Sequence, residues 1–455
     1  MIPKNLKYGS KVESSFAKLM RSNIAPQYGT GPYNLGDTII VNIPTRANLV
    51  LDTSNSYLKF NVNLTTTAAD TFARWDSCGA HGCIQRLRVF SGSNLIQDID
   101  NYGLLAKMLF DIQVSQDANI GKYSITTGTR NDYTTTSVTT TATACVMRNS
   151  GASIFSKTAD NTTVTKTYCL SLISLLGTLC SNQYLPLFGA TSAPLRMEIQ
   201  LVSVLQNALG YSVALPTFTM SNVEYVGSFI ELGDQAMRII EESLEGQPLQ
   251  FCIPDYRNYQ YNFSLTGGVN TQVSMPIPAK FSSLKSLFVT VRDNTGAINY
   301  FPFSCNAYGF VNYYFRVGSQ IMPTKLVETK TEAFCELLKA TATLSDILHT
   351  PSIDITSYTD DTNNLMTDIA VGATDATKLL AFVTSQSNSF YIGIDLENYS
   401  NAPKDSIFSG MNTNTDDIFF TGTFKPTATT TARFDSFALF DEVIVFENGT
   451  CYVKF

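Results

Sequence analysis

The chain has 455 residues and a net charge of −7 at pH 7, with 15% charged and 44% hydrophobic residues. Because ordinary soluble domains carry roughly 25% charged residues, much of this exterior is expected to pack against copies of the same chain. The acidic balance argues against a general nucleic-acid binder. We see neither a signal peptide nor a run of roughly 18 apolar residues that could span a membrane.

Residues 1–35 differ from the rest of the chain and are predicted to form a basic N-terminal arm. Apolar residues from Val12 to Met20 recur at the spacing of one helical face, which predicts a short amphipathic helix. The arm is either a frayed terminus or a segment that orders against a neighbouring subunit or an acidic partner. The residues assigned to this assembly arm are Lys4, Lys7, Lys11, Val12, Phe16, Lys18, Leu19 and Arg21.

From Asp37 onward, apolar and polar residues alternate along much of the chain. The alternation is clear in residues 58–64, 195–201 and 390–396. Each of these segments is typical of a strand with one buried and one wetter face in an antiparallel sheet. Many such strands, separated by turns rich in Gly, Asn and Thr, predict an all-β fold of sandwiches or jelly rolls with a few short helices.

Three short helices are predicted between the strands. The first is capped by Asp98 or Asp100 and has its apolar face at residues 104–112, and a weaker equivalent covers Thr331–Lys339. A third is capped by Asp234 and stops at Gly246. Its expected inward residues are Met237, Ile240 and Leu244. The polar segments 131–143 and 357–377 are predicted to be long external loops.

Two distant parts of the chain resemble each other at about half its length. Residues 88–96 (Arg-Val-Phe-Ser-Gly-Ser-Asn-Leu-Ile) match 316–323 (Arg-Val-Gly-Ser-Gln-Ile-Met-Pro) at an offset of 228 (316 − 88). The strand pattern of residues 57–65 recurs at 285–293 with the same offset. Such a long repeat indicates a duplicated domain rather than a solenoid. We therefore predict an arm at 1–35, a first jelly roll at 36–233, a helical linker at 234–248 and a second jelly roll at 249–455.

The sequence carries few of the residues that catalysis needs. Its two histidines, His81 and His349, lie in different halves, and neither a Gly-x-Ser-x-Gly elbow nor a phosphate-binding glycine loop is present. Cys78, His81 and Cys83 could ligate zinc, but zinc normally takes four ligands. We therefore favour a Gly-rich segment that leads into a strand and carries buried, reduced thiols. We therefore predict no enzyme activity, cofactor, metal or small-molecule substrate.

Several short motifs, in a fixed order, resemble those of a known family. Residues 75–77 (Trp-Asp-Ser), 84–92 and 96–105 are similar to the first half of double jelly-roll major capsid proteins, above all those of Polinton-like viruses and virophages. Residues 185–199 resemble the closing strands of that first jelly roll. Residues 315–323 and 409–441 resemble the matching turn and the closing part of the second.

The resemblance implies a major capsid protein that forms a homotrimer, whose pseudo-hexagonal capsomers tile an icosahedral virus shell. It implies location in the virion after assembly in the host cytoplasm or nucleus, with the loops 131–143 and 357–377 outermost and the arm on the inner face. The implied partners are neighbouring capsomers, penton and minor capsid proteins, and an inner membrane or the genome at the arm. The alternative is a non-viral β-sandwich adhesin or carbohydrate-binding protein, which the single tryptophan, Trp75, disfavours.

Overall fold

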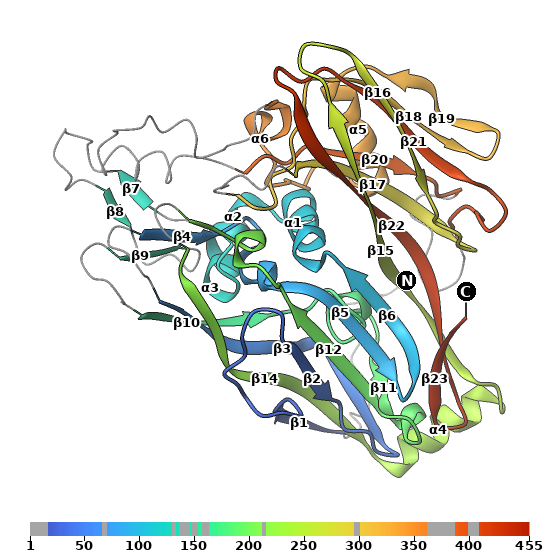
Figure 1. Cartoon of the computed structure of the whole chain (residues 1–455). Helices are drawn as coiled ribbons and strands as arrows, with labels where there is room; N and C mark the ends of the chain where they lie inside the picture. The colour runs from blue at the N-terminus through green and yellow to red at the C-terminus, as the bar shows by residue number, and fades with distance from the viewer. Residues whose placement is uncertain are drawn as a thin grey trace, which may run out of the picture.

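In a computed structural model of the chain, each half of the sequence forms an antiparallel β-sandwich, and the two sandwiches stand side by side (Figure 1). The predicted all-β fold of two tandem jelly rolls with a few short helices is thereby confirmed. The structure describes residues 17–65, 71–129, 133–135, 145–147, 153–156, 163–211, 215–294, 301–361, 387–398 and 409–454. None of the described helices is long and apolar enough to cross a membrane.

The first sandwich packs two sheets face to face. One sheet has the order β1 (Ala17–Ile24), β14 (Thr217–Leu232), β3 (Leu49–Thr65) and β10 (Thr163–Leu170), with β11 (Leu185–Pro186) also on β3. The other has the order β2 (Thr38–Asn42), β12 (Leu195–Leu201), β5 (Ile84–Ser91) and β6 (Asn94–Asp100). Smaller sheets join β13 (Leu209–Tyr211), β4 (Thr71–Trp75) and β9 (Ser153–Ser156), and β7 (Tyr133–Thr135) with β8 (Cys145–Met147).

The second sandwich repeats the four-strand order of both main sheets. Its first sheet has the order β15 (Leu249–Leu265), β22 (Thr430–Glu447), β17 (Leu284–Asp293) and β20 (Tyr391–Asp395), with β23 (Thr450–Lys454) also on β22. Its second has the order β16 (Thr271–Ile277), β21 (Ile418–Phe424), β18 (Phe310–Val317) and β19 (Gln320–Val327). The sequence repeat therefore lies where the fold repeats, because β3 corresponds to β17 and the β5–β6 hairpin corresponds to β18–β19.

The predicted first helix and its equivalent in the second half are both present. α1 (Tyr102–Gln113) follows β6, and α5 (Lys330–Ala340) follows β19. The predicted cap of α1 was wrong, because Asp98 and Asp100 belong to β6 and the residue that precedes the helix is Asn101, with φ of 49°. Asparagine tolerates this left-handed conformation better than most residues. The shorter helices are α2 (Gln116–Ala118), η3 (Asn119–Tyr123), α3 (Ser124–Thr126), α6 (Ile355–Thr359), η2 (Gly79–Cys83), η4 (Thr178–Cys180), η5 (Leu187–Ala190) and η6 (Leu205–Asn207).

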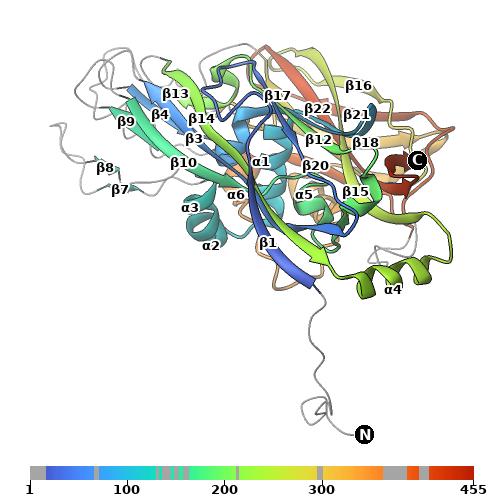
Figure 2. The ribbon, with the colours of Figure 1, turned by 90° about the horizontal axis from the view of Figure 1, so that it is seen from below.

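The predicted linker helix is α4 (Asp234–Leu244), which joins β14 to β15 at the edge of the molecule (Figure 2). Gly233 rather than Asp234 precedes its first turn. Met237, Ile240 and Leu244 lie on the less exposed face of this helix, as predicted, but they are only half-buried and no residue of the helix is fully buried. The helix lies beyond the ends of β14 and β15, so its apolar face has little sheet surface to pack against (Figure 2).

The helix predicted near Met20 was also wrong where the structure describes it. Residues 17–24 form the strand β1, which pairs with β14 from Ala17 opposite Leu232 to Ile24 opposite Tyr225. An apolar pair at i and i+4, such as Met20 and Ile24, fits one face of a helix and one face of a strand equally well. The open edge of β14 decides between the two. Residues 17–24 thus belong to a sheet of the first sandwich, in the position that β15 occupies in the second.

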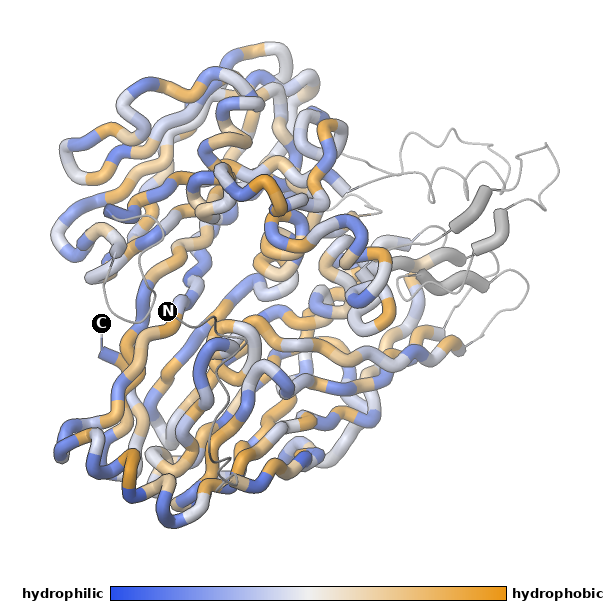
Figure 3. Tube along the Cα trace, turned by 180° about the vertical axis from the view of Figure 1, so that it is seen from behind, coloured by the Kyte–Doolittle hydropathy of each residue, from blue (hydrophilic) through white to orange (hydrophobic). Residues whose placement is uncertain are grey.

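The alternating segments form the core as expected, with one exception. Leu58, Phe60, Val62 and Leu64 of β3 are buried between the sheets, and apolar and polar positions alternate along many strands in Figure 3. β20 differs because Tyr391, Ile392, Gly393 and Ile394 are all buried. A Cβ atom on Gly393 would lie 3.0 Å from the Cα atom of Leu337 in α5, so the helix covers the face that was predicted to be wet.

Most of the two predicted external loops lies outside the described residues. Within 131–143 the structure describes only β7, and within 357–377 it describes the end of α6 and residues 360–361. The outward position of these loops stays a prediction.

Candidate functional site

The feature that most sets this chain apart from a single jelly roll is the seam where its two halves meet. The edge strand β6 of the first half lies against β15 and β23 of the second (Figure 1). Gln97 Nε2 donates to Asp255 Oδ1 at 2.6 Å, and the backbone N–H of Cys451 donates to Ser91 Oγ at 3.2 Å. Gln97, Ser91, Asp255 and Cys451 are buried, so these bonds are shielded from water.

Asn101, at the start of α1, joins the two halves through its amide group. Its Nδ2 donates to Asn258 Oδ1 at 2.8 Å and to Asp435 Oδ1 at 3.1 Å. Asp435 is fully buried and also accepts a 2.9 Å bond from Arg292 Nε. Arg433 donates back to Asn101 Oδ1 at 3.1 Å. The residue that begins a helix of one jelly roll therefore completes a charged network of the other.

A second buried network is centred on Lys107 and Asp111, one helical turn apart in α1. Lys107 Nζ donates to Asp111 Oδ2 and, at 3.0 Å, to Ser389 Oγ of the second half. Asp111 Oδ2 also accepts from Ser389 Oγ at 2.7 Å and from the Tyr391 hydroxyl at 2.8 Å. Burial alone would lower the pKa of Lys107, but the carboxylates of Asp111 and Asp76 outweigh it and raise the pKa. Both charges are thus held in the interior by groups from both halves.

The segment that carries Phe303 inserts into the first half beside these networks. The Phe303 backbone N–H donates to Asp76 Oδ2 at 2.9 Å. A Cβ atom built on Gly103 would lie 2.7 Å from the Phe303 ring, and one built on Gly82 would lie 3.1 Å from it. Glycine at these two positions therefore allows the close approach of the two halves.

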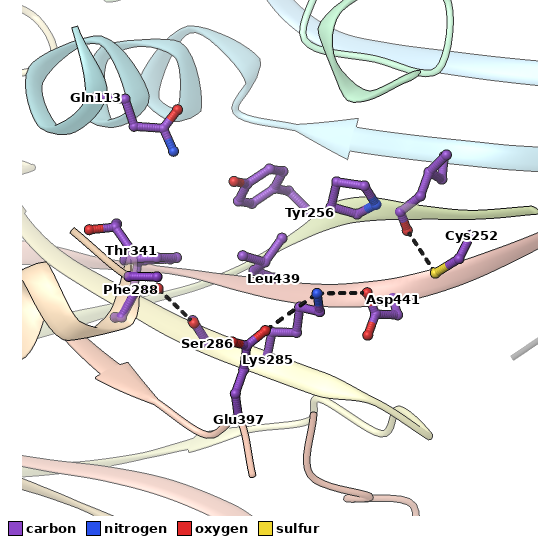
Figure 4. Close-up of a pocket in the computed structure, with 14 residues that line it drawn as sticks. Gln113, Cys252, Tyr256, Lys285, Ser286, Phe288, Thr341, Glu397, Leu439 and Asp441 are labelled. Atoms are coloured by element: carbon purple, nitrogen blue, oxygen red, sulfur yellow. Dashed lines mark hydrogen bonds and ion pairs between the residues drawn. The ribbon is translucent and has the colours of Figure 1, made fainter. Parts of the chain in front are cut away.

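A cavity of about 210 Å³ lies beside the seam, between Gln113 of α1 and the strands β15, β17 and β22 (Figure 4). Lys285 Nζ projects into it, 3.3 Å from Glu397 Oε1 and 3.1 Å from Asp441 Oδ1. Asp441 also accepts a 2.7 Å bond from Ser283 Oγ. The charged groups that line this cavity are therefore paired with one another.

The cluster at Cys78, His81 and Cys83 is buried in and beside η2, which confirms the predicted buried thiols. Burial raises the pKa of both thiols and lowers the pKa of His81 to about 3, so all three groups are uncharged near neutral pH. His81 Nδ1 lies 3.2 Å from the Tyr102 hydroxyl. In the described part of the chain, no three His, Cys, Asp or Glu residues are grouped as metal ligands.

The residues predicted to form the assembly arm divide into two groups. Lys18, Leu19 and Arg21 lie on β1 and are exposed, and Arg21 donates to the Tyr57 hydroxyl at 3.0 Å. The other five, Lys4, Lys7, Lys11, Val12 and Phe16, lie outside the described residues.

The networks at the seam were not predicted from the sequence, although one signal for them exists. Lys107 and Asp111 are charged residues four apart inside an otherwise apolar helical segment, Leu104–Ile112. Charged side chains at that spacing on a helix that is apolar all round indicate a buried pair. Their partners Ser389 and Tyr391 follow about 280 residues later, and no local pattern links them to α1.

Comparison of the sequence with protein-family models and with curated proteins finds no match. The structure, in contrast, is similar along its whole length to chains of solved virus particles and capsid proteins. A chain of the PBCV-1 virus capsid superposes with a TM-score of 0.60 at 10% identity, covering 99% of this chain and 100% of that one.

Two virophage structures superpose almost as well. The mavirus major capsid protein has a TM-score of 0.58 at 11% identity, covering 100% of this chain and 93% of that one. A chain of the Sputnik virophage has a TM-score of 0.57 at 10% identity, covering 100% and 91%. At these identities the likeness defines the fold, which is the double jelly roll of viral major capsid proteins.

Proposed function

We propose that this chain is a major capsid protein whose homotrimers form pseudo-hexagonal capsomers that tile an icosahedral virus shell. The observation that carries the proposal is the buried seam, which locks two jelly rolls of the same topology side by side in one chain. Three such chains present six similar domains around a three-fold axis, so a trimer can fill a six-fold position in a lattice. The role is structural rather than catalytic.

The size of the purified protein in solution tests this function. Light scattering after size-exclusion chromatography should give three times 50.0 kDa, and negative-stain images should show a hexagonal outline. Because obligate interfaces bury large areas, the trimer should persist on dilution to sub-micromolar concentration. A stable monomer over the same range of concentration would contradict the proposal.

The remaining partners follow from the same role. We propose that capsomers contact one another and penton and minor capsid proteins in the virion, after assembly in the host cytoplasm or nucleus. The basic arm is proposed to lie on the inner face, where it bridges capsomers or contacts an inner membrane or the genome. The support for this proposal is that two basic residues of the arm, Lys18 and Arg21, are exposed on β1.

Removal of residues 1–16 is expected to leave trimers intact and to prevent the closure of shells. This deletion keeps β1, whereas removal of residues 1–30 also removes the strand that pairs with β14 and should reduce folding itself. Electron microscopy of particles assembled from each variant, with the full chain as the control, provides the measurement. Closed shells of normal size from the 1–16 deletion would show that the arm is dispensable.

The alternative role of a carbohydrate-binding protein gains no specific support. Trp75 is 2% exposed, and its Nε1 donates to the Tyr168 hydroxyl at 2.9 Å in the core of the first sandwich. The single tryptophan is therefore not available to stack against a sugar ring.

A further inference from the structure

Three charged side chains meet in the cavity beside the seam, and each comes from a different segment of the second half (Figure 4). Lys285 lies on β17, Asp441 lies on β22, and Glu397 lies just after β20. Lys285 Nζ is 3.1 Å from Asp441 Oδ1 and 3.3 Å from Glu397 Oε1. An amine that is held against a carboxyl group can condense with it to an amide when a further group moves the protons.

The backbone holds these three residues, here called the triad, beside one another. The register between β17 and β22 shifts at Lys285, and a bulge of this kind re-aims a side chain. The N–H of Leu396 donates to the Lys285 carbonyl at 2.8 Å, which places the next residue, Glu397, alongside. The N–H of Asp441 donates to the Ser283 carbonyl at 3.0 Å. The triad is therefore positioned by the strands as well as by the attraction of its charges.

Both carboxylates of the triad also accept hydrogen bonds from serine hydroxyl groups. Ser283 Oγ donates to Asp441 Oδ2 at 2.7 Å, so this oxygen has a fixed donor while Oδ1 faces Lys285. Ser409 Oγ donates to Glu397 Oε1 at 2.9 Å and holds that carboxylate in place. A donor on the oxygen that remains and a base beside the nitrogen are the groups that amide formation uses.

The site admits little water. The side chains of Lys285 and Asp441 are 11% and 4% exposed, and Phe288 and Leu439 are among the apolar residues that line the cavity. Burial by itself lowers the pKa of Lys285, but the attraction of Asp441 and Glu397 outweighs it and raises the pKa. The ammonium group therefore gives up a proton to a carboxylate of the triad rather than to water. Burial narrows the gap in free energy between the ion pair and the neutral pair of amine and carboxylic acid.

We propose that Lys285 and Asp441 form an intramolecular isopeptide bond, with Glu397 as the acid–base group. Lys285 Nζ passes a proton to Asp441 Oδ1, and its free electron pair then attacks Asp441 Cγ. Glu397 takes a second proton from the nitrogen and gives it to the departing hydroxyl group, so that the Cγ–Oδ1 bond breaks and one water molecule leaves. The product is a secondary amide that keeps the third proton, and Glu397 returns to its starting state. The reaction consumes no other reactant.

The fold favours this bond and gains stability from it. Well-oriented groups within one molecule react with effective molarities of roughly 10⁵–10⁸ M, which favours the amide over the separate amine and acid. The bond links β17 to β22 and limits the conformations of the unfolded chain, as a disulfide does. It acts within one chain and does not depend on assembly.

The mass of the intact, denatured chain tests for the bond. The wild-type protein is expected to be lighter than its sequence by one water molecule. Lys285→Arg keeps the positive charge but replaces the amine with a guanidinium group that stays protonated, so this variant should have the full mass. Glu397→Gln keeps the amine and the Asp441 carboxyl group but cannot move the proton, and it should also have the full mass. Circular dichroism checks that both variants fold.

Protease digestion and tandem mass spectrometry of the wild-type protein locate the bond without any substitution. The peptides that contain Lys285 and Asp441 are expected as one linked species. The matched control is the pair Lys280 and Asp417, which is closer, at 2.8 Å, but has side chains that are 41% and 79% exposed. The peptides of this exposed pair should stay separate.

A second internal control is the buried pair Lys107 and Asp111. Among the described residues, Asp111 is the one carboxylate that forms an ion pair with Lys107, so this pair lacks a counterpart of Glu397. It should show no loss of water. The two controls therefore separate the need for burial from the need for a second carboxylate.

Each result decides one part of the assignment. A wild-type chain of full mass without a linked peptide would overturn the isopeptide bond and leave the proposed capsid function in place. A loss of water that persists in Lys285→Arg would lie elsewhere in the chain and would overturn it as well. A bond that forms to the wild-type extent in Glu397→Gln would support the link and overturn the role of Glu397.

Discussion

Replacing Lys107 with methionine is expected to lower the free energy of unfolding by about 3–5 kcal/mol, because it leaves the Asp111 carboxylate buried without its cation. Lys107 is fully buried and Asp111 is 4% exposed, so water cannot replace the lost partner. Ser389 and Tyr391 would still donate hydrogen bonds to Asp111. We therefore expect the loss of unfolding free energy not to exceed this range. Denaturant unfolding at a fixed protein concentration measures the change, since assembly contributes to apparent stability.

An exposed ion pair supplies the control for this substitution. Lys339 pairs with Glu336 three residues away in α5, and its side chain is 48% exposed. Lys339→Met is expected to change stability by about 0.5 kcal/mol or less. The double variant Lys107→Met with Asp111→Leu should recover much of the loss, because it removes the second charge as well. If the free energy of unfolding of the Lys107→Met variant lies within about 1 kcal/mol of the wild-type value, the network does not hold the halves together.

The stability of the chain is expected to fall as the pH rises from about 4 to about 7. Asp255 and Glu442 are buried at the seam, and within the described residues Asp255 Oδ2 and Glu442 Oε2 have no hydrogen-bond partner. Burial raises the pKa of Asp255 to about 7, against a weaker opposing effect of the Gln97 hydrogen bond and Arg257, while Asp98 adds to the rise. Burial and the Asp255 charge also raise the pKa of Glu442 well above its usual range.

The direction follows from the proton that the folded state retains. A carboxyl whose pKa is higher in the folded chain stabilises the fold while it is protonated, and this contribution is lost as it ionises. Each unit between the folded and unfolded pKa values corresponds to roughly 1.4 kcal/mol. Free energies of unfolding measured across this pH range should therefore slope downward for the wild type.

Asp255→Asn should flatten much of that slope, because the amide cannot ionise and still offers an oxygen to Gln97. Asp346→Asn, at an exposed carboxyl, is the matched control and should leave the slope unchanged. A wild-type stability that rises between pH 4 and pH 7, or a slope that Asp255→Asn does not alter, would contradict the assignment of the titration to this pair. If the pair is confirmed, a rise from acidic to neutral pH weakens the contact between the jelly rolls.

These results bear on how the chain works as a building unit. The seam networks join β6 and α1 of the first half to β15, β20 and β22 of the second, so the two jelly rolls are held in one relative orientation. A unit that already carries one correct contact between jelly rolls has less conformational entropy to lose when it assembles. The seam thus fixes the relative orientation of the two jelly rolls within one chain.

The sequence by itself determined the duplicated β architecture. The alternation in residues 58–64 requires one buried face, and a repeat at an offset of 228 residues requires two similar domains. The helices after residues 101 and 329 were equally predictable, because their apolar spacing is local. The strand and helix patterns depend on residues within a few positions of one another, and the repeat is found by comparing two such local patterns.

Only the tertiary structure decided the features that depend on distant partners. Residues 17–24 form a strand because β14 offers an open edge, although the spacing of Met20 and Ile24 also suits a helix. β20 is buried on both faces because α5 covers it, whereas the apolar face of α4 is only half-buried. Lys107 and Asp111 are stable in the interior only because Ser389 and Tyr391 reach them across the seam. Such pairings depend on how two halves pack, and the free energy of that packing is not contained in any local pattern of residues.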